Sequence, residues 1–379
     1  MTTDTYIRKL SALLDGHPVY LYWKGRVALY ALLKAMGVGP GDEVIVPGFT
    51  CVVVPNAIIY TGARPVYADI DRESMNVPAE AYQAAVTDKT KAIITQNTFG
   101  LSYQVDQIAA LGKEQKIFTI EDCTHGFGGT FSGQPNGTWC DAAFFSTQWN
   151  KPFSTGLGGF ALVNNRELLP ELEKVNRMLN PPSSTEKVSL WLQMAAHRML
   201  LNDSLYFFLR DLYRWLSRKN LVLGSSQGDE LSEPVMPGDY FKSHTSLQAG
   251  AGLKALRQIN ELNRLRKKNA EIYTEWLAAN NKYHVSGRFF PDHLFLKYPV
   301  LVENQDEFQE AARKHRIQLG DWFNTPLYPV KGNWEKWYLD SSKIPVALEV
   351  SRHIVNLPTE TRKPQKVISF LEHFKDKIL

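Results

Sequence analysis

The chain has 379 residues, of which 44% are hydrophobic and 22% are charged, and this length allows two or three packed units. The composition is that of an ordinary globular protein, which excludes disordered, collagen-like and coiled-coil classes. The net charge is only +4, and the basic residues are dispersed except for a cluster at 264–268 within a helical pattern. We therefore expect no nucleic-acid partner.

Cysteine usage and the N-terminal residues predict a protein of the reducing cytoplasm. Cys51, Cys123 and Cys140 are an odd number without zinc-ligand spacing, so neither a disulfide framework nor a metal site is expected. Residues 1–16 lack the basic start, apolar stretch and small-residue cleavage site of a signal peptide. No uninterrupted apolar run reaches the roughly 18 residues of a membrane span.

From residue 25 onward, short apolar strands alternate with helices of about ten residues. Helical spacing occurs at 25–38, 80–87 and 105–115, and β-rich runs occur at 43–47, 64–71, 91–97, 117–122, 141–147 and 158–165. Strands joined by helices form right-handed crossovers, which predicts an α/β fold with a mainly parallel sheet and helices on both faces. Ligands bind beyond the carboxyl ends of the strands in such sheets.

The alternation stops after about residue 165. A segment at about 175–235, bounded by Pro/Ser-rich and Gly/Ser-rich stretches, has the features of a helical insertion. Helical patterns at 247–279, 305–317 and 364–378 and a strand at 293–302 then predict a smaller C-terminal α+β domain. We expect a large domain over 1–250 that carries the insertion, and a small domain over 251–379.

The insertion contains an amphipathic helical pattern with an apolar side and a basic side. Two interpretations stay open: the helix packs on its own domain or across a dimer interface, or it docks onto a membrane surface or a lipid-linked intermediate. The apolar residues are Leu201, Leu205, Phe208, Leu209, Leu212 and Leu216, and the basic residues are Arg198, Arg210, Arg214, Arg218 and Lys219.

Lys151 and Asp122 are the first candidates for chemistry. Asp122 ends the strand at 117–122, and Lys151 follows the strand at 141–147, just before a glycine-rich turn. Alone, Asp122 fits a helix N-cap or a surface turn, and Lys151 fits a solvated lysine. Together they indicate pyridoxal phosphate chemistry, because a lysine of lowered pKa forms a Schiff base with a carbonyl and an acid keeps the cofactor ring nitrogen protonated.

A phosphate-binding group is predicted nearby. Ser146 lies five residues before Lys151, and Gly25, Arg26 and Val27 open the first helix of the expected sheet domain. A helix N-terminus offers backbone N–H groups to a phosphate, and a hydroxyl and a guanidinium would add charge-assisted hydrogen bonds. In isolation the same residues are equally consistent with an ordinary helix start.

At this point the chain resembles the DegT/DnrJ/EryC1/StrS aminotransferases, the sugar aminotransferase group of the fold type I pyridoxal-phosphate enzymes. The similar segments recur in the same order and cover nearly everything except the insertion. They are residues 25–71, 87–134, 141–165, 246–273, 320–330 and 344–358. The resemblance implies the aminotransferase fold type I, pyridoxal 5'-phosphate as cofactor, and a homodimer in which each subunit completes the site of the other.

Carried over to matching positions, the resemblance makes Lys151 the lysine that binds the cofactor aldehyde and Asp122 the partner of its ring nitrogen. His125 matches a Gln/His position that contacts the cofactor near its phenolic oxygen. Ser146 matches the phosphate-binding serine. Gly25 with Arg26 matches a small-residue pair that also binds the phosphate, and Val27 follows that pair.

Four positions depart from the family pattern. Cys51 stands where an aromatic residue usually stacks on the cofactor ring, so the ring must be covered by something smaller or by another segment. Arg26 replaces a hydroxyl residue, which preserves phosphate affinity by charge but alters geometry. Leu157 replaces an acid in the glycine turn, and Phe241 aligns with an asparagine that reaches the phosphate from the neighbouring subunit.

The resulting hypothesis is a cytoplasmic aminotransferase that moves an amino group, with glutamate as the expected donor, onto a nucleotide-linked keto sugar in polysaccharide or secondary-metabolite biosynthesis. One alternative is a non-catalytic binding protein that keeps the fold. Another is a sugar dehydratase of the same fold, which carries histidine at the lysine position. The identity of the sugar, the nucleotide and the aminated ring position stays open.

Overall fold

The computed structural model of the protein describes residues 2–200 and 228–379. Its centre is a seven-stranded sheet in the order β1-β10-β9-β6-β5-β2-β4. The five strands from β9 to β4 are mutually parallel. β10 runs antiparallel to β9, and β1 runs antiparallel to β10. The strands are β1 (Val19–Tyr22), β2 (Glu43–Pro47), β4 (Arg64–Ala68), β5 (Thr90–Gln96), β6 (Phe118–Asp122), β9 (Ala142–Ser146) and β10 (Gly159–Val163).

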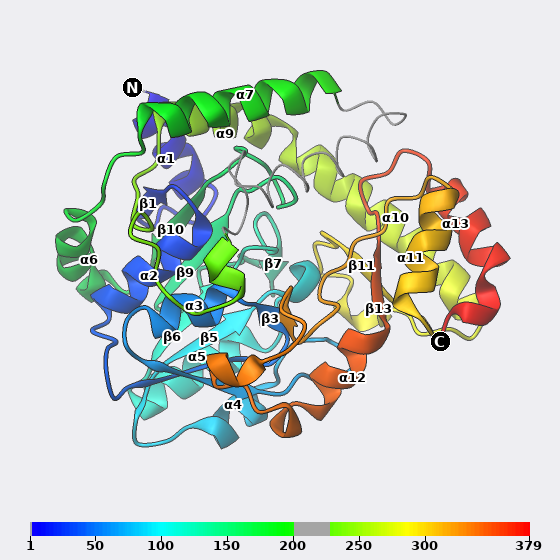
Figure 1. The fold of residues 1–379 in the computed structure, drawn as a ribbon, viewed down its shortest axis with the longest axis horizontal. Coiled ribbons are helices and arrows are strands. Elements are labelled where there is room, and N and C mark those ends of the chain that lie inside the picture. Colours follow the sequence, from blue (N-terminus) through cyan, green and yellow to red (C-terminus); the bar gives the residue numbers. More distant parts are fainter. Residues whose placement is uncertain (1, 201–227) are drawn as a thin grey trace.

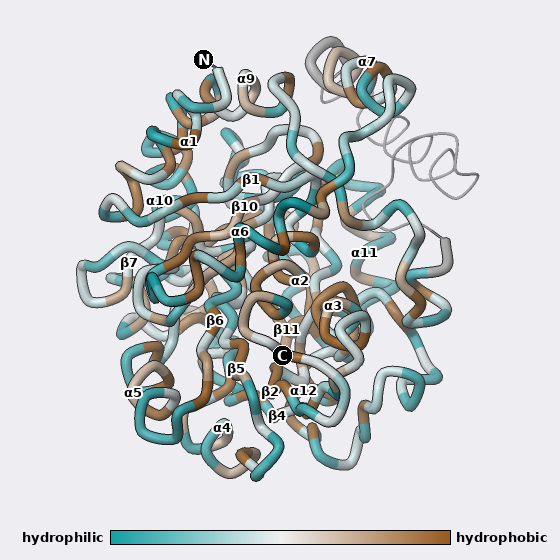
Figure 2. Tube along the Cα trace, turned by 90° about the vertical axis from the view of Figure 1, so that its left-hand side faces the viewer, coloured by the Kyte–Doolittle hydropathy of each residue, from teal (hydrophilic) through white to brown (hydrophobic). Residues whose placement is uncertain are grey.

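The predicted mainly parallel sheet is confirmed, and all six strands expected between residues 43 and 165 are present. β1 was not predicted. The helices of this part are α1 (Thr2–Ala12), α2 (Gly25–Ala35), α3 (Val53–Ile59), α4 (Ala79–Ala85), α5 (Val105–Gln115) and α6 (Leu169–Asn176). Helix α3 and the middle of strand β2 are hydrophobic (Figure 2), as buried elements must be.

The sheet is packed on both faces, because adjacent residues of one strand belong to two different hydrophobic clusters. Phe144 of β9 joins a cluster formed with α2 and α3, whereas the adjacent Phe145 joins a cluster formed with α1 and α9 (Ser246–Ala255). Successive strand side chains point to opposite faces of a sheet. The sheet is therefore covered on both faces, as the sequence predicted.

A smaller group of elements follows toward the C-terminus, with its own hydrophobic cluster (Figure 1). It consists of α10 (Ile259–Ala279), α11 (Gln305–Lys314), α13 (Pro364–His373) and the antiparallel pair β11 (Tyr298–Leu301) and β13 (Ile354–Leu357). Hydrophobic residues between 323 and 353, including those of α12 (Pro345–His353), pack instead into the larger cluster. We propose that the two clusters are the cores of the two expected domains.

The segment expected to be an insertion, about 175–235, contains α7 (Ser184–Leu200), which runs along one side of the molecule (Figure 1). Leu190 and Met194 of α7 are buried against Trp23 and Leu157. Most of the predicted amphipathic pattern at 198–219 lies outside the described residues. Among the helices that the structure describes, none is long and apolar enough to cross a membrane.

Candidate active site

The carboxyl ends of two neighbouring parallel strands bring Asp122 and Lys151 to one edge of the sheet. Asp122 is the last residue of β6, and Ser146 is the last residue of β9, which pairs with β6 in parallel. Lys151 follows β9 by a short turn in which its N–H donates to the Gln148 carbonyl at 3.1 Å. The structure therefore places both residues where the strand pattern predicted.

Lys151 is partly buried, and its side-chain amine has no hydrogen-bond or ion-pair partner in the described part of the chain. Its Nζ lies 4.6 Å from the ring centroid of Trp322. Burial lowers the pKa of Lys151 to about 8, against the opposing effect of the nearby Cys51 and Asp122. A lysine of this kind is partly in the neutral, nucleophilic form near neutral pH.

Asp122 is buried, and its Oδ1 accepts a hydrogen bond from the Thr124 N–H at 2.9 Å. Burial raises the pKa of Asp122, while the bonds from Thr124 and the charge of Lys151 favour the ionised carboxylate. The carboxylate is thus held in a dry environment at the ligand edge of the sheet. Such a group can hold a proton on a basic ring nitrogen.

His125 lies in the same site. Its ring stacks on the indole of Trp322 with centroids 4.6 Å apart and planes inclined by 5°. Burial, together with the charges of Lys151 and Lys297, lowers the pKa of His125 well below its usual value, so the imidazole is neutral. Its Nδ1 is buried without a hydrogen-bond partner in the described residues. A buried unpaired nitrogen of this kind is costly unless a ligand completes it.

The residues expected to bind a phosphate lie around the start of α2. A Cβ at Gly25 would lie 2.9 Å from the Phe145 carbonyl oxygen and 3.0 Å from Ser146 Cβ, so only glycine fits this close approach. The N-cap residue, Lys24, makes no side-chain capping bond. The Ser146 hydroxyl likewise has no partner within residues 2–200 and 228–379. The helix N-terminus is therefore open to an anion.

Two of the residues predicted to bind the phosphate make other contacts. The Arg26 guanidinium pairs with the Glu230 carboxylate at 2.6 Å, and both side chains are almost completely buried. Val27 packs its side chain in the hydrophobic core, and its N–H donates to the Lys24 carbonyl at 3.1 Å. The sequence did not predict Glu230, which comes from the far end of the insertion and offsets the charge of Arg26.

Lys24 is a further basic residue that sequence reasoning missed. It is buried, and burial together with Arg26 lowers its pKa to about 8. Its position directly before Gly25 was a usable signal, because the residue before a phosphate-binding helix start is close to the ligand.

An aromatic residue from a distant segment lies in the site near Cys51. Cys51 belongs to the short strand β3 (Thr50–Cys51), which pairs in parallel with β12 (Leu327–Tyr328). The chain that leads into β12 carries Trp322, whose indole contacts both Lys151 and His125. Trp322 is therefore an aromatic residue from another segment that lies beside Lys151 and His125.

Several buried hydrogen bonds fix the loop that carries Lys151. The hydroxyls of Thr147 and Thr155 lie 2.6 Å apart, and Thr155 also donates to the Leu157 carbonyl at 2.6 Å. Gln248 donates to the same carbonyl at 2.9 Å. Arg266 of α10 donates to the Pro152 carbonyl at 2.8 Å. The loop that carries Lys151 is therefore anchored by both α9 and α10, which limits its movement.

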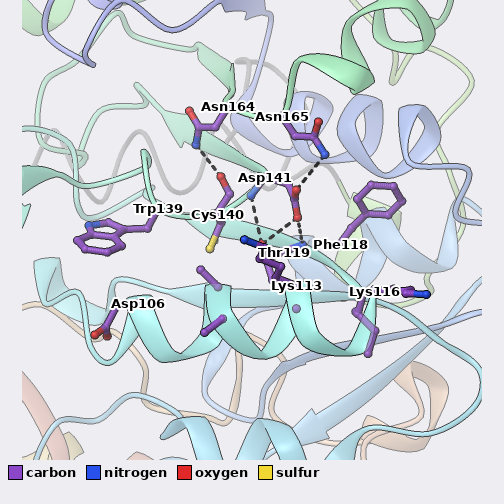
Figure 3. A pocket seen from close by; sticks show the side chains of 14 residues that line it. Asp106, Lys113, Lys116, Phe118, Thr119, Trp139, Cys140, Asp141, Asn164 and Asn165 are labelled. Atoms are coloured by element: carbon purple, nitrogen blue, oxygen red, sulfur yellow. Dashed lines mark hydrogen bonds between the residues drawn. The ribbon is translucent and has the colours of Figure 1, made fainter.

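A separate hollow lies at the opposite ends of the same strands (Figure 3). At its floor Asp141 accepts hydrogen bonds from Thr119 and Asn165, and Asn164 donates to the Cys140 carbonyl. These polar groups bond to one another, and the hollow is far along the strand from Asp122. Its contacts stabilise the start of β6 and β9.

Comparison with known proteins agrees with this geometry. The family model described as "DegT/DnrJ/EryC1/StrS aminotransferase family" matches residues 8–204 and 232–368. GDP-perosamine synthase of Escherichia coli O157:H7 is 40% identical over 330 residues, which cover 84% of this chain and 82% of that protein. UDP-N-acetyl-3-dehydro-alpha-D-glucosamine 3-aminotransferase of Acidithiobacillus ferrooxidans is 37% identical over 338 residues, covering 88% and 77%.

Solved structures show the same fold. A DegT DnrJ EryC1 StrS aminotransferase from Brucella abortus superposes with a TM-score of 0.76 at 22% identity, covering 99% of this chain and 91% of that one. NtdA from Bacillus subtilis, with bound cofactor PMP, has a TM-score of 0.74 at 19% identity, covering 100% and 78%. The stretch that the family model leaves unmatched, 205–231, falls inside the expected insertion. The chain belongs to the DegT/DnrJ/EryC1/StrS aminotransferase family.

Proposed function

We propose that the protein is a pyridoxal-phosphate-dependent aminotransferase that transfers an amino group from glutamate to a keto sugar carried on a nucleoside diphosphate. The observation that carries the proposal is the unpaired Lys151, with its pKa lowered to about 8, beside the buried Asp122 at the carboxyl edge of the sheet. The names of the two relatives above, a GDP-sugar enzyme and a UDP-sugar enzyme, support the substrate class.

The residues present fit the cofactor. Gly25 leaves the start of α2 free of a side chain, and Ser146 adds a hydroxyl, as a phosphate requires. The unpaired Nδ1 of His125 offers one bond to an oxygen of the ring, and Asp122 offers a carboxylate to the ring nitrogen. Trp322 offers an aromatic surface. NtdA, of the same fold, holds PMP, the amine form of this cofactor.

Pyridoxal phosphate, when bound, supplies an aldehyde that accepts amino groups and an electron sink for charge at the reacting carbon. Lys151 would hold that aldehyde covalently until the amine of the donor displaces it. The freed Nζ would then take a proton from the amine-bearing carbon of the donor and return it to the carbon that was the aldehyde carbon. Asp122 would keep the ring nitrogen protonated. The hydrogen-bonded loop at 147–157 would keep Lys151 aimed at the reacting carbon.

We also propose a homodimer, because sharing of the two sites is what the family resemblance implies. Sedimentation of the purified protein tests it, and a fully active monomer would contradict it.

The main test is borohydride reduction of the purified protein, followed by peptide mapping. The cofactor should attach to Lys151, and Lys151→Ala should lose both the attachment and, by orders of magnitude, the transfer of amine from glutamate to a GDP- or UDP-linked keto sugar. Asp122→Asn should keep the attachment, because the covalent bond belongs to Lys151, but lose most of the rate. Attachment to a different lysine, or a colourless protein that binds nucleotide sugar without turnover, would contradict the proposal.

A further inference from the structure

A second lysine of the site has no assigned role. Lys297 lies directly before β11, in the C-terminal group of elements, and is partly buried. It has no hydrogen-bond or ion-pair partner among the residues described. Two acids, Glu360 and Asp321, act on the charge of Lys297, but both form hydrogen bonds with other residues. Glu360 accepts two hydrogen bonds from Arg266, at 2.6 and 3.1 Å. Asp321 accepts one from the Tyr328 hydroxyl at 3.1 Å.

Lys297 and Lys151 approach the same aromatic side chain. The Lys297 Nζ lies 5.7 Å from the Trp322 ring centroid, and the Lys151 Nζ lies 4.6 Å from it. The charge of Lys297 also contributes to lowering the pKa of both Lys151 and His125. Burial lowers the pKa of Lys297 itself.

Among the described residues, Asp122 is the one carboxylate that acts on the charge of Lys151, whereas Lys297 and Arg26 both act on it as cations. Under the proposed function Asp122 is also needed for the ring nitrogen. An unpaired ammonium in a partly dry site is costly unless an anion binds it. Trp322 adds a cation–π contact that holds the Lys297 head group near the ring without neutralising its charge.

We propose that Lys297, held against Trp322, binds a carboxylate of the amino donor. This inference rests on the proposed function. The α-carboxylate of an amino acid is attached to the same carbon that carries the reacting amine, so it must enter close to Lys151. The diphosphate of a nucleotide sugar is separated from a reacting ring carbon by the sugar itself, which places it farther from Lys151 and from the indole that both lysines share.

The test measures binding of glutarate, a dicarboxylate that lacks the amine, to the cofactor-loaded enzyme by titration calorimetry. Lys297→Met removes the charge and keeps the apolar stem, and we expect it to weaken glutarate binding by about tenfold or more. Lys297→Arg keeps the charge and should retain most of the affinity. Lys113→Ala, at an exposed lysine of α5, is the matched control and should equal the wild type.

GDP and UDP provide the second arm of the experiment, because an ammonium also binds a diphosphate. Their affinities should be unchanged in Lys297→Met. Unchanged glutarate affinity in this variant, no glutarate binding by the wild type, or a loss confined to GDP and UDP would each overturn the proposal. Borohydride attachment of the cofactor to Lys151 is scored separately in every variant. Failure of the proposed function would appear there in the wild type, independently of glutarate binding.

Discussion

The buried pair between Arg26 and Glu230 allows a quantitative prediction. Its two side chains are 5% and 3% exposed, and their closest atoms are 2.6 Å apart. Glu230→Ala would remove the carboxylate that pairs with the buried Arg26 guanidinium. The backbone anchor of Glu230 would remain, because its carbonyl accepts a bond from Asn56 Nδ2 at 2.9 Å. The substitution therefore reports mainly the loss of the charge partner.

Breaking a buried ion pair on one side costs about 3–5 kcal/mol, so we expect Glu230→Ala to lower the free energy of unfolding by that amount. The exposed pair between Lys174 and Glu171, with side chains 64% and 54% exposed, is the control. Glu171→Ala should change stability by about 0.5 kcal/mol or less. Urea unfolding followed by tryptophan fluorescence, at fixed protein and cofactor concentrations, measures both.

The double variant Arg26→Met with Glu230→Leu separates charge from packing. Replacing both partners with apolar residues removes the buried charges together, so the double variant should recover most of the stability lost in Glu230→Ala. A loss in Glu230→Ala no larger than that of the exposed control would refute the reasoning. So would a double variant that is less stable than Glu230→Ala, since the pair would then matter for its shape and not for its charge.

Three other substitutions or conditions test the site. Burial lowers the pKa of Lys151 to about 8, and only a neutral amine attacks an aldehyde. The rate at which cofactor attaches to the cofactor-free enzyme, measured by stopped-flow absorbance, should therefore increase up to about pH 8 and then level off. A rate that still increases toward about pH 10 would contradict this. Leu157→Glu should lower thermal stability, whereas Leu157→Met should not, because position 157 is fully buried against Leu190; equal melting temperatures would count against it. Gly25→Ala should weaken cofactor affinity about tenfold in equilibrium dialysis while the fold persists, since its Cβ would lie 2.9 Å from the Phe145 carbonyl; wild-type affinity would disprove the close approach.

The strands of the sheet and the edge that carries the site were predictable because their signals are local. Each parallel strand is a short apolar run between helices, and Asp122 and Ser146 stand at the ends of such runs. Predictions for the C-terminal part were coarser. The long helix expected at 247–279 is divided into α9 and α10, and the strand expected at 293–302 shortens to Tyr298–Leu301.

The partners of the site residues could not be predicted, because they come from distant parts of the chain. Glu230 meets Arg26 across 204 residues, and Trp322 meets Lys151 and His125 from the segment before β12. Neither contact leaves a periodic pattern or a fixed residue spacing that could be recognised in the sequence. Lys297 stands in a run that reads only as a strand, so its unpaired charge becomes visible once the structure shows which acids lie near it and what they bind.

Leu157 shows how an apparent defect in a motif can have a packing cause. The acid expected in the glycine turn is replaced by a residue that is fully buried with Trp23, Leu190 and Met194. Leu190 and Met194 belong to α7, the first helix of the insertion, and both also lie 3.0 Å from where a Cβ of Gly156 would be. A carboxylate at 157 would be buried without a counter-charge under this helix. Packing under α7 therefore explains why an apolar residue fits at position 157, and the backbone of the turn is held independently of that side chain, because Gln248 donates to the Leu157 carbonyl.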